Sequence, residues 1–204
     1  PEPPKVEFNP KEDVVSLPYT SGTTGLPRGV MLTHYNTVFN IAQWKAFFPF
    51  LEDGEEVCVA YTPFYHALGW GFSVAAALIL GYTQVILTSP IPDDIIGVIR
   101  SEKVTFFYGA PSLYEVLKDY EKTDRVDWKR LKLIISGADP LLKDTSEHWE
   151  ARTGVKLQEA YGMTELTCLV HGTQPGKEKA GSVGIPVSSV RAGIVDYEED
   201  KFLL

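Results

Sequence analysis

The chain lacks an excess of basic residues. Its 204 residues carry 19 Lys and Arg against 27 Asp and Glu, which gives a formal net charge of −8. Nucleic-acid-binding domains and proteins that attach broadly to anionic lipid are normally basic, so this balance argues against both kinds of partner. With 44% hydrophobic residues, the chain is long enough to bury one or two sizeable cores.

Cysteine is also scarce. Cys58 and Cys168 are the only two, and their spacing fits no metal-ligand pattern. The sequence leaves a disulfide between them open, but it shows no secretory signal, so we expect reduced thiols and a cytoplasmic protein. The chain starts at Pro1 without an initiator Met and stops at Asp-Lys-Phe-Leu-Leu. We therefore expect it to be a piece of a longer protein.

One uncharged run, Ala67–Leu87, has the length needed to span a bilayer. Gly81-Tyr82-Thr83-Gln84 interrupts it, with a helix-like apolar stretch before and β-branched Val85 and Ile86 after. This pattern favours a buried helix followed by a buried strand, and we expect no integral membrane span.

Strand-like and helix-like runs alternate along most of the chain. Strands are predicted over Val14–Thr20, Glu56–Tyr61, Gln84–Thr88, Val104–Tyr108, Leu131–Ile135 and Val155–Glu159. Helices are predicted over Tyr35–Phe48, Gly69–Leu80, Asp93–Arg100, Pro111–Tyr120 and Leu142–Arg152, with Thr33 capping the first, Gly81 ending the second and Pro111 opening the fourth. This alternation predicts an α/β fold with a mainly parallel sheet flanked by helices on both faces. After Gly172 the sequence turns to Gly, Pro and short alternating runs such as Val190–Val195, which indicates a small antiparallel piece.

The stretch YTSGTTGLPRGV, Tyr19 to Val30, combines glycines, hydroxyl groups and one permanent cation. Its glycines let the backbone N–H groups approach an anion closely, and its hydroxyls and Arg28 add further donors. A flexible surface turn would have the same composition. The stretch is not the P-loop of kinases and GTPases, because two residues rather than four separate Gly22 from Gly25 and no Gly-Lys-Ser/Thr follows. Val30-Met31-Leu32 predicts a strand leaving the loop, and hence a hairpin.

Three further loops after predicted strands carry chemical groups, and ligands of such sheets bind beyond the carboxyl ends of strands. EAYGMTEL, Glu159 to Leu166, offers an aromatic face, a hydroxyl and a carboxylate that can hold Mg²⁺, although a strand-to-helix turn capped by Thr164 is the alternative. TPFYHALGWG, Thr62 to Gly71, places His66 among aromatic residues, where a half-buried structural histidine is the usual finding. SGADPL, Ser136 to Leu141, brings Gly137 to a strand end, and Asp139 there is equally explained as a turn residue.

The first two stretches resemble two signatures of the adenylate-forming superfamily, Tyr-Thr-Ser-Gly-Thr-Thr-Gly-x-Pro-(Lys/Arg)-Gly-Val and Tyr-Gly-x-Thr-Glu. That family contains acyl- and aryl-CoA ligases, adenylation domains of peptide synthetases and beetle luciferases. The PFYH segment, SGADPL and GSVGIP (Gly181–Pro186) extend the resemblance over nearly the whole chain. Arg28 is a departure, because the family usually has Lys there; the charge is kept, but as a planar fork.

The resemblance implies a role for each matching residue. The loop that binds the phosphates of ATP would consist of Thr20, Ser21, Gly22, Thr23, Thr24, Gly25 and Arg28. Tyr161 would pack on adenine, with Gly137, Ala138, Gly162 and Met163 lining the AMP site. Thr164 would contact the α-phosphate, Glu165 would coordinate Mg²⁺, and His66 and Gly137 would lie beside the acyl group, His66 orienting or gating it. Catalytic importance is expected for Thr164, Glu165 and His66.

The resemblance also implies a layered αβαβα fold, with residues 1–172 forming part of the large N-terminal domain and 173–204 beginning a β-barrel-like subdomain. The family's mobile C-terminal lid, with a Lys that contacts the acyl-adenylate, is absent from this sequence. The implied reaction is activation of a carboxylic acid by ATP with Mg²⁺, then transfer of the acyl group to coenzyme A. The resemblance also makes a homodimer possible, since the family often forms one, but nothing in the sequence tests it.

Several alternatives remain open from the sequence. A fatty acid is favoured by large apolar residues near the third loop (Phe64, Tyr65, Trp70, Phe72) and by Phe106-Phe107-Tyr108, although all of these could be core. An aryl-CoA ligase is the nearest alternative, and a peptide-synthetase adenylation domain is disfavoured because no Asp follows Tyr65-His66 closely. The chain alone could be a nucleotide-binding module without turnover. A phosphotransferase is remote, since the Gly-Lys-Ser/Thr element is missing.

Overall fold

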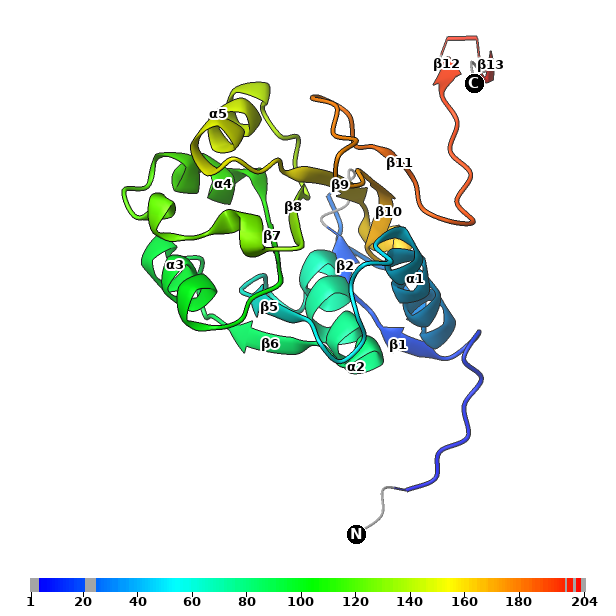
Figure 1. Cartoon of the computed structure of the whole chain (residues 1–204). Coiled ribbons are helices and arrows are strands. Elements are labelled where there is room, and N and C mark those ends of the chain that lie inside the picture. Colours follow the sequence, from blue (N-terminus) through cyan, green and yellow to red (C-terminus); the bar gives the residue numbers. More distant parts are fainter. Residues whose placement is uncertain (1–3, 21–24, 197, 200, 203–204) are drawn as a thin grey trace.

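The computed structural model describes residues 4–20, 25–196, 198–199 and 201–202. Its centre is a seven-stranded sheet between two layers of helices, with strand order β11-β10-β9-β8-β7-β5-β6 (Figure 1). The sheet strands are β5 (Val57–Ala60), β6 (Thr83–Ile86), β7 (Phe106–Gly109), β8 (Leu133–Gly137), β9 (Gln158–Gly162), β10 (Leu169–Gly172) and β11 (Ile185–Pro186). The helices are α1 (His34–Phe47), a π-helical segment (Gly69–Ala75), α2 (Ala76–Leu80), α3 (Pro92–Ser101), α4 (Pro111–Asp119) and α5 (Lys143–Thr153), with 3₁₀ turns at Thr123–Arg125, Trp128–Arg130 and Thr164–Leu166.

The five neighbouring strands β6, β5, β7, β8 and β9 run parallel. Strand β10 then pairs antiparallel with β9, and β11 pairs antiparallel with β10. The mainly parallel α/β sheet predicted from the alternation is therefore confirmed. The described residues form three layers, helix, sheet and helix; no second large sheet of an αβαβα arrangement is found among them. Because parallel strands end at one edge, the turns after β5, β8 and β9 share that edge.

Successive residues of the central strands face opposite helix layers, as the pleat of a strand requires. On one side Val59, Phe107 and Ile134 pack against α3, α4 and α5. On the other side the neighbouring residues of the same strands, among them Cys58, Phe106 and Leu133, pack against α1, the π-helical segment and α2. Strand β8 is buried at all five positions, which confirms the central strand predicted at Leu131–Ile135, two residues further along the chain.

The predicted helix ends are confirmed. The Thr33 side chain accepts a hydrogen bond from the Asn36 N–H, while the Asn36 side chain accepts one from the Thr33 N–H, a reciprocal cap that fixes the start of α1. Gly81 ends α2 in the left-handed conformation that glycine tolerates. Pro111 occupies the first turn of α4.

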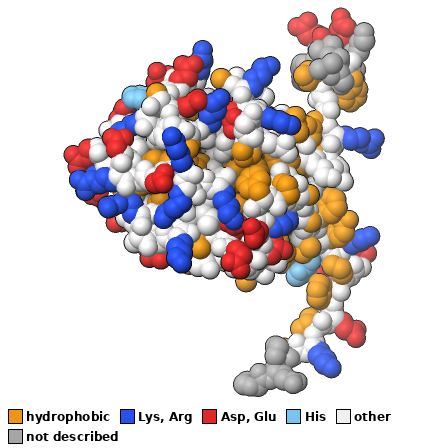
Figure 2. All heavy atoms as spheres, viewed as in Figure 1, with side chains coloured by type: hydrophobic (Ala, Val, Ile, Leu, Met, Phe, Trp, Pro, Cys, Tyr) orange, Lys and Arg blue, Asp and Glu red, His pale blue; other side chains and the backbone are white. Residues whose placement is uncertain are grey.

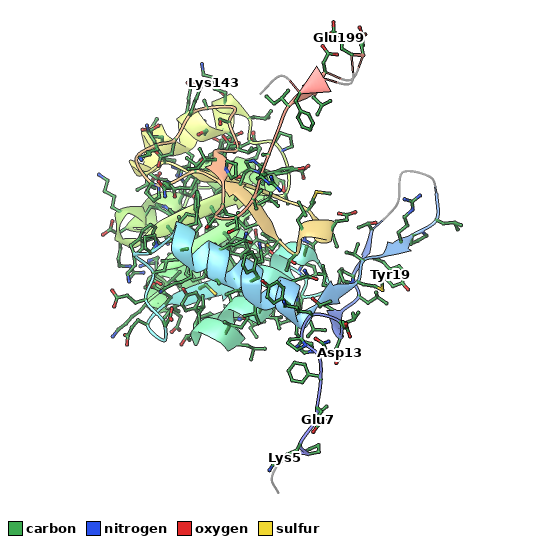
Figure 3. The ribbon with its side chains drawn as sticks, turned by 90° about the vertical axis from the view of Figure 1, so that its right-hand side faces the viewer. Lys5, Glu7, Asp13, Tyr19, Lys143 and Glu199 are labelled. Atoms are coloured by element: carbon green, nitrogen blue, oxygen red, sulfur yellow. The ribbon has the colours of Figure 1, made fainter. Side chains whose placement is uncertain are left out.

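The N-terminal strand predicted over Val14–Thr20 is wrong as a single element. Residues 14–16 form β1, which pairs with β4 (Leu32–Thr33), and Tyr19–Thr20 form β2, which pairs with β3 (Arg28–Gly29). Pro18 lies between them, and a proline has no N–H for a continuous ladder. The hairpin predicted around the Gly/Thr loop is confirmed by the antiparallel β2–β3 pair, which projects from the body near Tyr19 (Figure 3).

The uncharged run Ala67–Leu87 folds as the π-helical segment, α2 and β6, as predicted for a helix followed by a strand. Within the described ranges, no helix is both long and apolar enough to cross a membrane. The expectation of a buried strand is wrong, because β6 is the last strand of the sheet and Ile86 is 63% exposed. Strand β6 pairs with β5 on one side, and a strand on its other side would have been needed to bury it.

Beyond β9 the chain leaves the parallel pattern. Strand β10 was not predicted, and β11 returns to pair with it at the sheet edge. The small antiparallel piece predicted after Gly172 is confirmed: β12 (Val195–Asp196) pairs antiparallel with β13 (Lys201–Phe202), apart from the main sheet (Figure 1).

The outer face of α1 is apolar as well as its inner face. Trp44 and Ile41 are buried against the sheet, whereas Tyr35, Val38 and Phe39 are exposed. Figure 2 shows apolar side chains gathered over the part of the surface where α1 lies, while charges of both signs are mixed over the α3–α5 side.

Candidate functional site

The strand ends of β8 and β9 carry the centre of the site. Gly137 is the last residue of β8 and pairs with Ala160 of β9, and Gly162 is the last residue of β9. The stretches SGADPL and EAYGMTEL therefore begin inside the strands rather than after them. This brings two segments that are distant in sequence into direct contact.

Two glycines permit that contact. A Cβ atom at position 162 would lie 1.5 Å from the carbonyl oxygen of Cys168, and one at position 137 would lie 2.9 Å from the carbonyl oxygen of Ala160. Neither position can hold a side chain without moving the backbone. Ala138 follows with a φ of 77°, an unusual left-handed conformation for a residue with a Cβ. Such strained turns cluster at ligand sites.

A cavity of about 160 Å³ opens at this edge; we call it the His66 cavity. Seven of the predicted site residues meet in its wall: His66, Gly137, Ala138, Tyr161, Gly162, Met163 and Thr164. The remaining wall is apolar and comes from Ala67, Leu68, Phe72, Ala160, Cys168 and Leu169. The structure thus combines residues from three of the four predicted loops in one pocket with an apolar interior.

His66 lies at the exposed side of this cavity. Its Nδ1 accepts a hydrogen bond from the Leu68 N–H at 3.2 Å, which places the proton of the neutral imidazole on Nε2. Nε2–H is a donor that suits a carboxylate oxygen. His66 is therefore an exposed residue and not the half-buried structural histidine that is the usual finding among aromatic residues.

A second cavity of about 260 Å³ adjoins the first; we call it the Glu159 cavity. Both cavities are lined by Ala138, Ala160, Tyr161 and Gly162. Ser136, Asp139, Pro140, Leu141, Glu159, Gly181 and Val183 complete the second one. Burial raises the pKa of the Glu159 carboxyl, and a hydrogen bond from the Gly181 backbone partly opposes that rise. The Tyr161 ring is 45% exposed and meets the His171 ring edge-on at 6.0 Å, so an aromatic face remains available for stacking.

Sequence reasoning missed Glu159, Gly181 and Val183 as site residues. Glu159 was predicted as an ordinary strand residue, yet it precedes the Tyr161 motif by two positions and so lies on the same side of the strand. Gly181 and Val183 reach the site only because β11 folds back onto β10. No local sequence signal predicts that return.

Glu165 does not line the His66 cavity. It is exposed on the 3₁₀ turn Thr164–Leu166 and lines a groove of about 450 Å³ beside α1, together with Tyr35, Phe39 and Tyr161. Among the described residues, no group of three or more His, Cys, Asp or Glu could hold a metal ion. Any metal here would have to take most of its ligands from a bound molecule or water.

Only part of the phosphate loop can be placed. Ser21, Gly22, Thr23 and Thr24 lie outside the described residues. Thr20 and Arg28 face each other across the β2–β3 pair, and the Thr20 Oγ1 donates to the Arg28 carbonyl at 3.5 Å. Gly25 has a φ of 95°, which glycine accepts readily. Thr20, Gly25 and Arg28 do not line the His66 or the Glu159 cavity.

Most of the aromatic residues suggested for the acyl group lie elsewhere. Phe106, Phe107 and Tyr108 are fully buried core residues of β7. Phe64 and Tyr65 are exposed. Of the aromatic residues proposed, Phe72 is the one that lines the His66 cavity. Cys58 and Cys168 are buried free thiols, and burial raises the pKa of each to about 12.

Known proteins match this chain over most of its length. A long-chain-fatty-acid–CoA ligase of Bacillus subtilis is 34% identical over 196 residues, covering 96% of this chain and 35% of that protein. The 4-coumarate–CoA ligase 3 of Oryza sativa is 32% identical over 203 residues, covering 91% of this chain and 35% of its own. The chain thus spans about a third of the length of these relatives.

Solved structures give the same picture. The apo structure of MatB from Rhodopseudomonas palustris superposes with a TM-score of 0.88 at 28% identity, covering 100% of this chain and 39% of that one. The ATP-bound structure of the same protein gives a TM-score of 0.84 at 30% identity, covering 98% and 39%. A long-chain-fatty-acid-CoA ligase from Archaeoglobus fulgidus gives 0.84 at 29% identity, covering 97% and 41%. The family described as AMP-binding enzyme matches residues 1–203, and the chain belongs to that family.

Proposed function

We propose that the protein containing this chain is an AMP-forming acid–thiol ligase. It activates a carboxylic acid with ATP as an acyl-adenylate, releases pyrophosphate and passes the acyl group to coenzyme A. The observation that carries this proposal is the junction of two cavities at Ala138, Tyr161 and Gly162. The first has His66 at its exposed side and Phe72 and Leu169 in its wall, which suit a carboxylate and its apolar chain. The second has Glu159 and the exposed face of Tyr161, which suit a base.

In the adenylation step a carboxylate oxygen attacks the α-phosphorus, and the bond to the pyrophosphate oxygen breaks. His66 Nε2–H would hold the carboxylate, and the Thr164 hydroxyl, in the same wall, would donate to an α-phosphate oxygen. In the second step the thiolate of coenzyme A attacks the acyl carbon and AMP departs. The protein needs no covalent nucleophile, because alignment and charge neutralisation supply the acceleration.

The base would lie in the Glu159 cavity. Its plane would stack on Tyr161, and the Gly137–Ala138 backbone would approach it closely, since position 137 has no side chain. Burial raises the pKa of the Glu159 carboxyl, and the carboxyl oxygens at the cavity wall can accept a hydrogen bond from an amino group of the base. The β2–β3 hairpin, with Thr20, Arg28 and the predicted loop residues 21–24, would hold the β- and γ-phosphates.

Mg²⁺ fits the donor set at the Thr164–Leu166 turn. This ion commonly takes one or two carboxylates and completes its shell with substrate phosphates and water, so a single exposed Glu165 suffices. When bound, Mg²⁺ would offset charge on the triphosphate.

The acid proposed first is a fatty acid, because the interior of the His66 cavity is apolar and the curated relatives include long-chain-fatty-acid–CoA ligases. An aryl acid is the second candidate, since a 4-coumarate–CoA ligase is similar over the same region. A cytoplasmic location and a homodimer stay predictions. A nucleotide-binding module without turnover is the competing function for this chain alone.

Carboxylate-dependent exchange of labelled pyrophosphate into ATP tests the proposal. The protein containing this chain should catalyse exchange with at least one class among fatty, aryl and amino acids. Exchange that depends on the acid would support adenylation and identify the substrate. ATP binding without exchange for any acid would leave a nucleotide-binding module, and release of ADP would point to phosphotransfer instead.

A further inference from the structure

The turn between β9 and β10 ends on a strained residue. Thr167 directly follows the Thr164–Leu166 turn and has a φ of 73° and a ψ of −61°. These are the angles of a γ-turn with positive φ, a rare and strained conformation, and the Cys168 N–H donates to the Leu166 carbonyl at 3.0 Å as that turn requires. Positive φ is unfavourable for a β-branched residue, because its side chain crowds the backbone, whereas glycine adopts such angles readily.

The chain after Thr167 is held by its neighbours. A Cβ on Gly162 would lie 1.5 Å from the Cys168 carbonyl oxygen, so the two backbones are in direct contact. Leu169 pairs with Gly162 across the β9–β10 ladder, and the Asn40 amide binds the Leu169 N–H and carbonyl at 3.2 and 2.8 Å. A strained residue persists only where its surroundings fix the conformation, and these contacts fix it from the β10 side.

The turn before Thr167 closes on itself. The Leu166 N–H donates to the Met163 carbonyl and the Thr167 N–H donates to the Thr164 carbonyl, both at 3.1 Å. The side chains of Glu165 and Leu166 are exposed. Because the strand on the other side is fixed, a change of the backbone angles at residue 167 would move this turn and leave β10 in place.

The turn directs two neighbouring side chains to different places. Thr164 lines the His66 cavity, whereas Glu165 lines the groove beside α1. Met163 lines both, so it marks the boundary between them. In the proposed ligase Thr164 donates to the α-phosphate and Glu165 holds Mg²⁺, so a shift of the turn would displace both groups at once.

We propose that Thr167 is a positioning residue for adenylation. Its γ-turn fixes the direction of Thr164 and Glu165, and the backbone angles rather than the hydroxyl group carry this role, since the residue is only 3% exposed. The inference rests on the proposed ligase function and adds to it a residue that acts through its neighbours.

Three replacements at position 167, made in the protein containing this chain, test the inference. Thr167→Gly permits positive φ, Thr167→Val keeps the β-branched shape without the hydroxyl, and Thr167→Pro forbids positive φ. With the acid that the wild type uses best, pyrophosphate exchange by the Gly and Val variants should stay within about threefold of the wild-type rate. In Thr167→Pro the rate should fall about 100-fold, because misplacing reacting groups by about 1 Å can cost that much.

Two further measurements separate positioning from a loss of folded protein. A smaller folded fraction lowers the rate without changing the Mg²⁺ concentration needed for half-maximal exchange, whereas a displaced Glu165 should raise that concentration about tenfold. Calorimetry with no acid present should show Mg²⁺-dependent ATP binding weakened about tenfold in Thr167→Pro.

Ser189→Pro is the matched control. Ser189 also has a positive φ, of 64°, which proline forbids in the same way. It is exposed and lines neither the two cavities nor the groove beside α1. This variant should lose thermal stability as Thr167→Pro does, yet keep the wild-type Mg²⁺ requirement and ATP affinity.

Weakened Mg²⁺-dependent binding and exchange in Thr167→Pro, with both kept in Thr167→Gly and Ser189→Pro, supports the inference. A wild-type Mg²⁺ requirement in Thr167→Pro would overturn it and leave the ligase function standing. A loss of about tenfold in both Thr167→Gly and Thr167→Val would do the same, because it would assign the role to the hydroxyl.

Absence of exchange in the wild type with every acid would overturn the ligase function and the inference together. If Thr167→Pro does not fold, Thr167→Gly decides. An unchanged Mg²⁺ requirement in that variant supports a role for the backbone angles, and a raised one contradicts it.

Discussion

The side-chain amide of Asn40 pairs with the backbone of Leu169 in both directions. Its Nδ2 donates to the Leu169 carbonyl at 2.8 Å, and its Oδ1 accepts from the Leu169 N–H at 3.2 Å. Helix α1 thereby binds β10 as a neighbouring strand would, 129 residues away in sequence. Leu169 lines the His66 cavity, so this pair connects α1 to the candidate site.

Asn40→Leu should destabilise the fold by about 2–4 kcal/mol, because two buried backbone groups of Leu169 would lose their partner. Denaturant unfolding measures the loss. Ala42→Gln, on the exposed face of the same helix, is the control and should change stability by less than about 0.5 kcal/mol. An Asn40→Leu variant as stable as the wild type would show that the amide pair contributes nothing.

Gly162→Ala should destabilise the fold by at least about 3 kcal/mol and abolish nucleotide binding, because its Cβ would overlap the Cys168 carbonyl. The matched control is Gly97→Ala in α3, an exposed position with nothing within 4 Å of the added atom. There the removal of a helical glycine should stabilise by about 0.5–1 kcal/mol. Thermal unfolding with and without ATP separates the two effects; equal behaviour of the variants would contradict the close approach at β9.

Glu56 and Lys132 form a 2.7 Å ion pair that should make the free energy of unfolding depend on pH in the acidic range. Burial of the Glu56 carboxyl raises its pKa, but hydrogen bonds from Lys132, Thr105 and the Glu52 N–H together outweigh burial and leave the pKa lowered from 4.5. A lowered folded pKa gives stability that is present above the unfolded value and is lost as pH falls through the folded one.

Unfolding free energy should therefore decline as pH drops below about 4.5. Glu56→Gln should lower stability at neutral pH by about 1–3 kcal/mol and flatten the decline. Glu52→Gln serves as the control, because its side chain is 70% exposed and lies 4.0 Å from Lys132. If both variants kept the wild-type pH profile, the pair would have no role in acid stability.

Glu165→Gln should weaken Mg²⁺-dependent pyrophosphate exchange at least about tenfold and raise the Mg²⁺ concentration needed for half-maximal rate. A neutral amide is a much poorer ligand for a hard cation than a carboxylate. The control is Glu121→Gln, which changes an exposed acidic residue on the opposite helix layer. This variant should leave both the exchange rate and the Mg²⁺ requirement unaltered. Unchanged Mg²⁺ dependence in Glu165→Gln would remove the proposed metal role.

Native Cys58 and Cys168 should react with iodoacetamide at neutral pH only after unfolding. The thiolate is the reactive form, and a pKa raised from 9.0 to about 12 leaves about a thousandfold less of it, in addition to burial. Mass spectrometry of labelled protein measures this. Rapid labelling of Cys168 in the native state would indicate that the wall of the His66 cavity opens.

Local sequence patterns predicted the features that depend on local chemistry. The apolar run at Leu131–Ile135 predicted a central strand, and Thr33, Gly81 and Pro111 predicted helix ends, because caps and strand burial follow from neighbouring residues. The predicted start of this strand was two residues early: the Lys132 N–H still donates to the Thr105 carbonyl just before β7, but β8 begins at Leu133.

Features that depend on distant contacts could not be predicted. The π-helical form of Gly69–Ala75 accompanies tight packing of Gly69 on the Pro63 carbonyl and of Gly71 on Cys168. Strand β10 is short and follows a turn in which Thr167 has a φ of 73°, so no periodic pattern of residues predicts it. In the site, the motif residues were predicted, whereas Glu159 and Gly181 required knowledge of which strands adjoin.

The order of strands in the sheet has a consequence for how the chain can acquire its structure. Strands β6 and β7 add to opposite edges of β5, and β8, β9, β10 and β11 are each placed beside the strand before them in the chain. A ribosome that releases the chain from its N-terminus would therefore present each new strand to an edge already formed. Both cavities depend on β9, and the His66 cavity depends also on the start of β10, so the binding region would be completed late, on a scaffold of β5 to β8 that is already in place.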